Sequence, residues 1–129
     1  MIPGESVNGE INEIRKRLLM AKPKTSEVKI EIDAAYNRFE PAEVSPEAEI
    51  VKLLSNSTKS VLGESSEIYG APYSSDVRNL VNDFGIDAVN FGPGNVHECH
   101  CADERVELRK VTECALVISD LIEKLIIKN

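Results

Sequence analysis

The chain of 129 residues contains no tryptophan, only two histidines and three cysteines, and few aromatic residues of any kind. An odd number of cysteines without regular spacing gives no disulfide framework and suits a reducing compartment. The N-terminal stretch MIPGESVNGEINE also lacks the basic and apolar segments of a secretion signal. We therefore predict a cytoplasmic protein.

Positive charge is in deficit, because 22 acidic residues outnumber 15 basic ones and the formal net charge is -7. Nucleic acids and anionic membranes are bound through clustered positive charge, so we expect neither as a partner. The longest apolar stretch, near the C-terminus, is interrupted by Asp120, Glu123 and Lys124, which rules it out as a bilayer span. Hydrophobic residues make up 42% of the chain, which is enough for the core of a folded domain.

Hydrophobic periodicity predicts an α/β protein. A helix is expected over 6–22 with Ser6 as its N-cap, followed by an alternating strand over 28–32. Residues 37–46 carry two prolines and no periodicity, which indicates a connector. A second helix should open at Ser45-Pro46, with Pro46 in its first position, and end at Gly63.

The second half of the chain is predicted to contain strand, helix, strand and helix at 68–69, 75–84, 88–91 and 108–128. A β-α-β order usually gives parallel strands, and open α/β sheets bind ligands at the carboxyl ends of such strands. The loop after the strand at 88–91 reads GPGNVHECHC and holds both histidines and two of the cysteines. This loop is therefore the candidate site.

The run His97-Glu98-Cys99-His100-Cys101 differs from the H-E-x-x-H zinc signature, because its histidines are three residues apart and the preceding Gly-Pro-Gly disfavours a helix. A closed structural zinc site would need a second pair of ligands, and only Cys114 remains. A surface loop without any ligand is a further interpretation.

Several motifs follow one another in an order that resembles one family. They are Ser75-Asp76-x-Arg78, Gly85-Ile86-x-x-Val89, Phe91-Gly92-Pro93-Gly94 and His100-x-x-Asp103-Glu104. This succession looks like the C-terminal part of the zinc-dependent amidohydrolases and peptidases that include acetylornithine deacetylase, succinyl-diaminopimelate desuccinylase, aminoacylase and glutamate carboxypeptidase. The segment Pro3-Gly4-Glu5 before the first helix is similar to part of the family's smaller lid domain.

The resemblance implies an α/β fold. It comprises the last strand-helix-strand portion of an α+β lid (dimerisation) domain at 1–36, the connector at 37–46, and the C-terminal part of a zinc-peptidase-like catalytic domain at 47–129. The lid helix would then pair two chains into a homodimer. Such enzymes cleave an N-acyl amide or peptide bond next to a free carboxylate, using two zinc ions, or cobalt or manganese in their place, to activate water.

The resemblance also implies roles for individual residues. His100 would bind metal, and the residues implied in substrate binding are Arg78, Gly92, Gly94 and Ser75. For Arg78 an ion pair with Asp76 or another acid that holds the loop is an equal alternative, and a helix cap would explain one of Ser74 and Ser75. Gly92 and Gly94 would let the backbone turn sharply beside the ligand. His97 has no counterpart in the family pattern and is expected only near the site, as is Asp76.

The family's other metal ligands and its catalytic base lie in an H-x-D pair and a Glu-Glu pair, and neither occurs in this sequence. No catalytic residue is therefore assigned, and the general base is expected upstream. We expect a fragment that is inactive alone and needs the missing N-terminal half of the catalytic domain to act on an N-acyl amino acid or peptide. The alternative is a non-catalytic module that binds a metal or a partner through His97, Cys99, His100 and Cys101.

Overall fold

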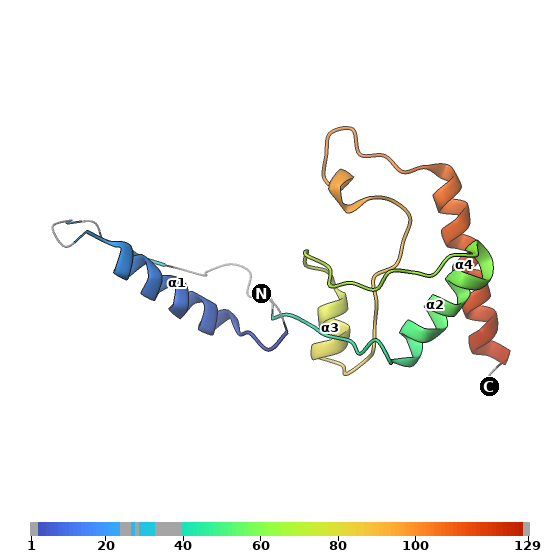
Figure 1. Ribbon diagram of the computed structural model, residues 1–129, viewed down its shortest axis with the longest axis horizontal. Helices are drawn as coiled ribbons and strands as arrows, with labels where there is room; N and C mark the ends of the chain where they lie inside the picture. The colour runs from blue at the N-terminus through green and yellow to red at the C-terminus, as the bar shows by residue number, and fades with distance from the viewer. Residues whose placement is uncertain (1–2, 24–26, 28, 33–39, 128–129) are drawn as a thin grey trace. The chain divides into compact units, whose positions relative to one another are not determined.

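The computed structural model describes residues 3–23, 27, 29–32 and 40–127. The helices of this part are α1 (Val7–Ala21), α2 (Glu49–Leu62), α3 (Val77–Asn82), the 3-10 helix η1 (Val96–Glu98) and α4 (Leu108–Ile127), as Figure 1 shows. The chain divides into two units, Met1–Glu43 with Tyr73–Ile86, and Val44–Pro72 with Asp87–Asn129.

Helix α1 of the first unit begins as predicted. The Ser6 hydroxyl accepts a hydrogen bond from the Gly9 N–H at 3.1 Å, which is the usual N-cap contact. The Val7 N–H lies 3.3 Å from a carboxylate oxygen of Glu40, so a second orphan N–H of the helix start is also satisfied. A negative charge at this position favours the helix dipole, and Glu40 thereby joins the predicted connector to the helix.

Helix α3 is shorter than the predicted helix at 75–84. It ends at Asn82 with Asp83 as its C-cap, and Gly85, two residues further on, has a φ of +65° and donates its N–H to the Val81 carbonyl at 3.1 Å. The Asn82 side chain donates to the Pro41 carbonyl at 3.3 Å, which ties α3 to the residues before α2. Residues 73–86 group with the N-terminal part of the chain. The division into a lid at 1–36, a connector at 37–46 and a catalytic part at 47–129 stays a prediction.

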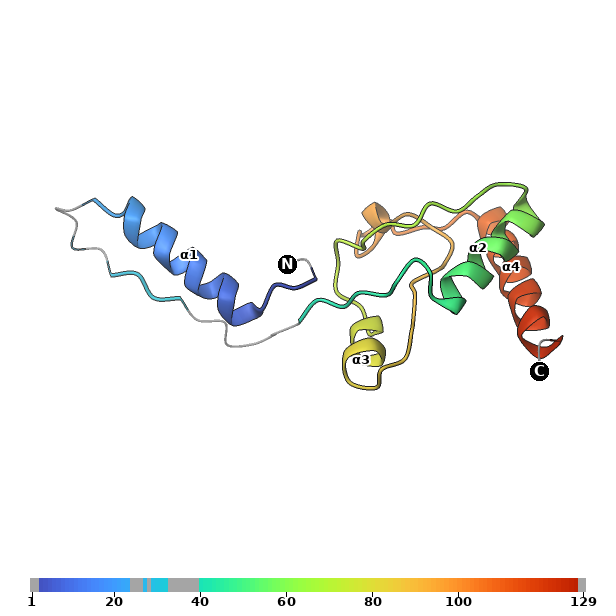
Figure 2. The ribbon, with the colours of Figure 1, turned by 60° about the horizontal axis from the view of Figure 1, so that its bottom comes forward.

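Helices α2 and α4 lie side by side in the second unit, as Figures 1 and 2 show. Ser45 and Pro46 form a turn in which the Ala48 N–H donates to the Ser45 carbonyl at 2.9 Å, so α2 starts slightly later than the Pro46 signal predicts. The predicted end at Gly63 is confirmed, because Gly63 caps the helix with a φ of +75°. The predicted helix over 108–128 is α4.

The core between these two helices is small. The buried apolar side chains of the second unit are Val51, Cys114, Val117 and Leu121, and Val117 has no exposed surface. All three from α4 lie on the stripe that its helical periodicity predicts. The neighbouring stripe of α4 remains open, with Ile118 40% and Ile122 49% exposed.

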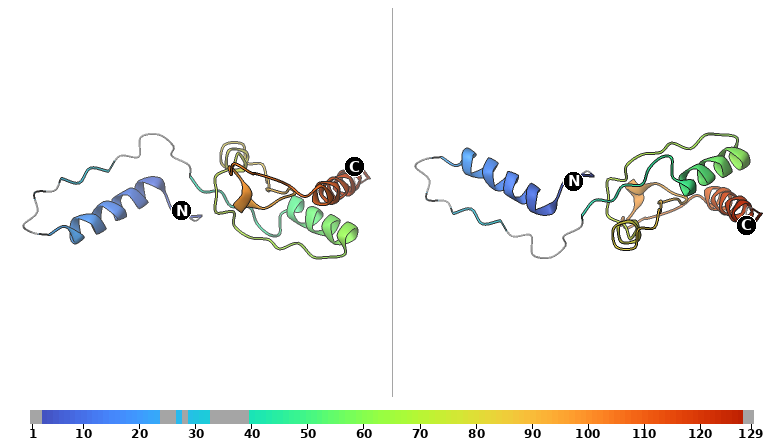
Figure 3. Two further views of the ribbon diagram at one scale, coloured as in Figure 1. Left: turned by 90° about the horizontal axis from the view of Figure 1, so that it is seen from above. Right: turned by 90° about the horizontal axis from the view of Figure 1, so that it is seen from below.

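A polar group also crosses the α2–α4 interface. The Ser57 side chain is fully buried, and its hydroxyl accepts a hydrogen bond from the Lys124 ammonium at 3.3 Å. The same ammonium donates to the Asp120 carboxylate at 2.6 Å. A buried hydroxyl is costly without a partner, so the contact between Lys124 and Ser57 favours one register of α2 against α4. Figure 3 shows the two helices from above and below.

The predicted strands are not formed in the part of the chain that the structure describes. Residues 68–69 and 88–91 run without strand pairing, and so do 29–32, while Val28 lies outside the described residues. A strand's hydrogen bonds come from a neighbouring strand, unlike those of a helix. The α/β sheet therefore stays a prediction.

The Asp120–Lys124 pair predicts a specific pH dependence of stability. Hydrogen bonds from Lys124 and Ser57 lower the pKa of Asp120 below its ordinary value in the folded chain. A lowered pKa contributes stability above the unfolded pKa of about 3.9, and this contribution is lost as the pH falls through the folded value. In urea unfolding followed by helix circular dichroism, Asp120→Asn should therefore be less stable than wild type above pH 4, and the difference should shrink toward zero in stronger acid. Glu123→Gln, which removes a charge from the exposed side of α4, is the control and should give no such convergence.

Candidate functional site

Residues 94–106, which we call the histidine loop, are closed by three nested contacts. At the base, the Val106 side chain lies over Gly94, so that a Cβ built on Gly94 would be 3.7 Å from Val106 Cγ2. Further in, Arg105 Nε lies 3.4 Å from Glu98 Oε2. Nearest the tip, the His100 N–H donates to Glu104 Oε2 at 3.0 Å. The loop thus folds back on itself and carries His100 close to its tip.

The first half of the histidine loop is a single turn of 3-10 helix. Asn95 is the N-cap of η1, and its side-chain oxygen accepts from the His97 N–H at 3.0 Å. The turn continues through a bond from the Cys99 N–H to the Val96 carbonyl at 3.2 Å and ends there. His97 and His100 therefore share no helix, which agrees with our interpretation that this run is no H-E-x-x-H signature.

His100 has an unusual backbone conformation. Its φ is +61°, and it is the one non-glycine residue in the described part of the chain with a positive φ. This left-handed state costs a residue with a Cβ about 1–2 kcal/mol, although histidine is among the types that adopt it more often. A hydrogen bond contributes about 1 kcal/mol, so the Glu104 contact offsets part of the strain. The side chain is exposed rather than buried in an apolar interior.

The two glycines of the Gly-Pro-Gly turn are not equivalent. Gly94 has a φ of +111°, a region open almost only to glycine, so the predicted sharp turn is present there. Gly92 lies outside the left-handed region and has open space where a Cβ would be. A backbone conformation that requires glycine is therefore present at Gly94 and not at Gly92, while a role of either residue beside a ligand stays a prediction.

The cysteines differ in accessibility. Cys99 and Cys101 are exposed, and their thiols donate to the carbonyls of Asn95 at 3.9 Å and His97 at 3.6 Å. Cys114 is buried between α2 and α4, and burial raises the pKa of its thiol. The buried thiol is a packing group, as its place on the α4 stripe predicts.

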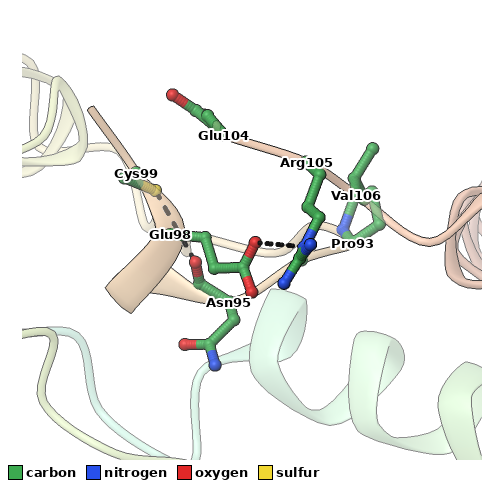
Figure 4. A pocket seen from close by; sticks show the side chains of 8 residues that line it. Pro93, Asn95, Glu98, Cys99, Glu104, Arg105 and Val106 are labelled. Atoms are coloured by element: carbon green, nitrogen blue, oxygen red, sulfur yellow. Dashed lines mark hydrogen bonds and ion pairs between the residues drawn. The ribbon is translucent and has the colours of Figure 1, made fainter. Parts of the chain in front are cut away.

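An open pocket of about 410 Å³ lies against the base of the histidine loop. It is lined by Pro93, Gly94, Asn95, Glu98, Cys99, Glu104, Arg105 and Val106. Figure 4 shows the Glu98 carboxylate and the Arg105 guanidinium facing each other there, and the Cys99 thiol directed at the Asn95 carbonyl. The pocket therefore presents charges of both signs, with the positive one already paired.

The ligand-type side chains of the histidine loop are not gathered into a metal site. In the part of the chain that the structure describes, no three His, Cys, Asp or Glu side chains stand close enough to hold one ion. Zinc sites in proteins use three or four such ligands. The residues present therefore fit the role of contributing one ligand and do not fit a complete metal centre, so the alternative of a self-contained metal module receives no support.

The other predicted site residues belong to the first unit, where they form the start of α3. Asp76 occupies the N-cap position, and its carbonyl accepts from the Asn79 N–H at 2.9 Å. The Ser75 carbonyl accepts from the Arg78 N–H at 3.4 Å. The Asp76 side chain makes no cap hydrogen bond, and Ser75 and Arg78 are both half-buried at the turn.

Sequence reasoning missed the residues that shape the loop. It did not single out Asn95 or Arg105, and it gave Glu104 only a general place in a motif. A usable signal was present for Asn95, because asparagine before a short turn is a frequent N-cap. The contact of Glu104 with His100 exists only in the folded loop. The pairing of Glu98 with Arg105 follows only from the folded loop.

The protein-family model described as Peptidase family M20/M25/M40 matches residues 3–124, which is almost the whole chain. The chain belongs to this family. Its members are hydrolases that generally bind zinc or other divalent metals, so the class of protein is a metal-dependent hydrolase of peptidase type. No curated protein and no solved structure matches the chain.

Of the helices in the described residues, none is both long enough and apolar enough to cross a bilayer.

The two glycines make a matched pair of variants. Gly94→Ala forces a Cβ into a φ of +111° and should lower the free energy of unfolding by about 1–3 kcal/mol. Gly92→Ala should be neutral within about 0.5 kcal/mol or slightly stabilising. Urea unfolding of both variants tests this, and equal losses would contradict the assignment of the turn to Gly94.

Thiol labelling tests the burial of the cysteines. Iodoacetamide should modify Cys99 and Cys101 of the folded chain rapidly, because both are exposed. Cys114 should react only after unfolding in urea, since access is blocked and its raised pKa leaves little thiolate. Mass spectrometry counts the adducts, and three equally fast additions would show that α2 and α4 do not pack in solution.

Proposed function

We propose that this chain is the C-terminal part of a metal-dependent hydrolase that cleaves an N-acyl amide or peptide bond next to a free carboxylate. The observation that carries the proposal is the family match over residues 3–124. It is supported by the histidine loop, which offers the His100 side chain to solvent from a backbone fixed by nested contacts. The substrate class is that of an N-acyl amino acid or a peptide, as in the deacetylase, desuccinylase and carboxypeptidase types.

His100 is the residue that we assign to the metal, with zinc as the first choice and cobalt or manganese as substitutes. A single imidazole holds zinc weakly, because protein zinc sites draw on three or four ligands. The remaining ligands of a two-ion centre, and the carboxylate base, would come from the N-terminal half of the catalytic domain. We therefore expect this chain alone to have little activity and no tight metal site.

The carboxylate of the substrate would be recognised by Arg78, since a guanidinium pairs with a carboxylate through two parallel hydrogen bonds. Arg78 stands in the first turn of α3 next to Ser75, whose hydroxyl could add a polar contact. Gly94, and with it Gly92, would let the main chain approach the ligand closely, because neither has a side chain. His97 stays next to the site without an assigned contact.

The fold and assembly that we propose follow the same assignment. Residues 47–129 would complete an α/β catalytic domain whose sheet includes 68–69 and 88–91, and the open stripe of α4 with Ile118 and Ile122 would be covered by that domain. Helix α1 would belong to a lid that pairs two chains, since Ile14 and Leu18 on one of its faces are exposed. We place the protein in the cytoplasm.

The experiment supplies the missing groups and removes one histidine at a time. The chain is mixed with an N-terminal segment of a family member that carries the H-x-D and Glu-Glu pairs, and release of the acid from N-acetyl and N-succinyl amino acids is measured in the presence of zinc. We expect activity from the mixture, none from either part, and loss of at least about 100-fold with His100→Ala. His97→Ala is the matched control and should retain activity, because it neighbours the site without binding the ion.

Two outcomes would contradict the proposal. One is equal loss of activity in the two histidine variants, which would remove the special role of His100. The other is tight, stoichiometric zinc binding by the isolated chain that is abolished by Cys99→Ser or Cys101→Ser, because the chain would then contain a metal site of its own. Reading the genome upstream of Met1 for in-frame H-x-D and Glu-Glu pairs is the least costly first check.

A further inference from the structure

We propose that Glu104 is a positioning residue, which fixes the backbone of His100 and thereby aims its imidazole. This inference rests on the proposed role of His100 as a metal ligand. The Glu104 carboxylate accepts the His100 N–H at 3.0 Å, and the Glu104 N–H donates to the Cys101 carbonyl at 3.2 Å. Glu104 thus binds the loop at two points, the His100 N–H and the Cys101 carbonyl, and these two points flank the peptide bond between His100 and Cys101.

The neighbouring N–H groups show why His100 needs a side-chain acceptor. The Glu98, Cys99 and Cys101 N–H groups donate to the carbonyls three residues before them, at 2.9, 3.2 and 3.4 Å. Within this run His100 is the exception, because its N–H is taken by the Glu104 carboxylate. Its left-handed φ of +61° interrupts the series of turns, and the carboxylate supplies the partner that a backbone carbonyl supplies for the others.

The direction of the imidazole depends on this contact. The Cβ of a residue moves with its backbone, so a return of His100 from the left-handed to the common right-handed or extended region would swing the ring away from its present direction. A metal ligand must be held to within about 0.5 Å and 10–20° of its productive geometry. A carboxylate that holds the strained backbone therefore acts on the metal through His100 without touching the ion.

The Glu98–Arg105 ion pair plays a supporting part. This ion pair joins the two sides of the loop further from the tip than the contact between His100 and Glu104. Arg105 Nε and Glu98 Oε2 are 3.4 Å apart, and the Arg105 side chain is largely exposed. Such an exposed pair contributes little and is screened by salt. We therefore assign the fixing of His100 to Glu104 and not to Arg105.

The first measurement uses the chain by itself. Solvent exchange of the His100 amide, followed by NMR, should be severalfold faster in Glu104→Ala than in wild type, because the N–H loses its acceptor. Glu104→Gln should restore slow exchange, since the amide oxygen of glutamine can accept the same bond. Asp103→Ala removes an equal charge from the adjacent position and should leave the His100 amide unchanged. Helix circular dichroism of each variant confirms that α2 and α4 remain folded.

The second measurement uses the mixture with the N-terminal segment. Glu104→Ala should weaken zinc affinity by roughly 10- to 100-fold, the range seen when a group that orients a metal ligand is removed. Glu104→Gln should recover most of this loss, and Asp103→Ala should bind zinc as wild type does. Competition with a chelator gives the affinities independently of turnover.

The results separate the two proposals. If His100→Ala leaves zinc affinity and activity unchanged, the proposed function fails, whatever Glu104 does. If His100→Ala abolishes zinc binding while Glu104→Ala changes neither His100 amide exchange nor zinc affinity, the proposed function stands and the positioning role of Glu104 is refuted. Failure of Glu104→Gln to restore both quantities would also refute it, because a hydrogen bond to the side-chain oxygen is the mechanism proposed.

Discussion

A zinc ion in a protein is held by several ligands that converge on one point, and under our proposal this chain would contribute one of them, His100, from a closed loop. In the described residues, no second and third ligand-type side chain stands beside His100. The proposed metal role of His100 depends on this constraint, because a single imidazole binds zinc weakly. If the proposal holds, the histidine loop would keep His100 in place for ligands that come from another segment.

The histidine loop accomplishes this with local contacts of small individual energy. A glycine that tolerates a φ of +111°, an ion pair and one hydrogen bond to a carboxylate are nested around the loop. None of them would hold a loop alone, since exposed ion pairs and single hydrogen bonds each contribute on the order of 1 kcal/mol or less. Nesting matters because each contact shortens the loop that the next one has to close.

The sequence predicted the features that are decided within a few residues. Ser6 at the start of α1, Gly63 at the end of α2 and the buried stripe of α4 follow from capping and periodicity, which need no knowledge of distant parts. The role of Gly94 was predictable for the same reason, whereas Gly92 shared the motif without sharing the backbone conformation. Glu104 escaped because its bond to His100 exists only once the loop has reversed direction.

The proposed sheet and the proposed metal site share one physical requirement. Helix hydrogen bonds close within one segment, so α2 and α4 form and pack around Val117 and Ser57. A strand needs a neighbour for each hydrogen bond, and a metal ion needs ligands from several segments. Residues 88–91, as the proposed strand, and His100, as the proposed ligand, are close in sequence, and both would require groups that are distant in sequence. A segment that supplied the other ligands would, if it also supplied the neighbouring strand, complete both at once, because the histidine loop begins where 88–91 ends.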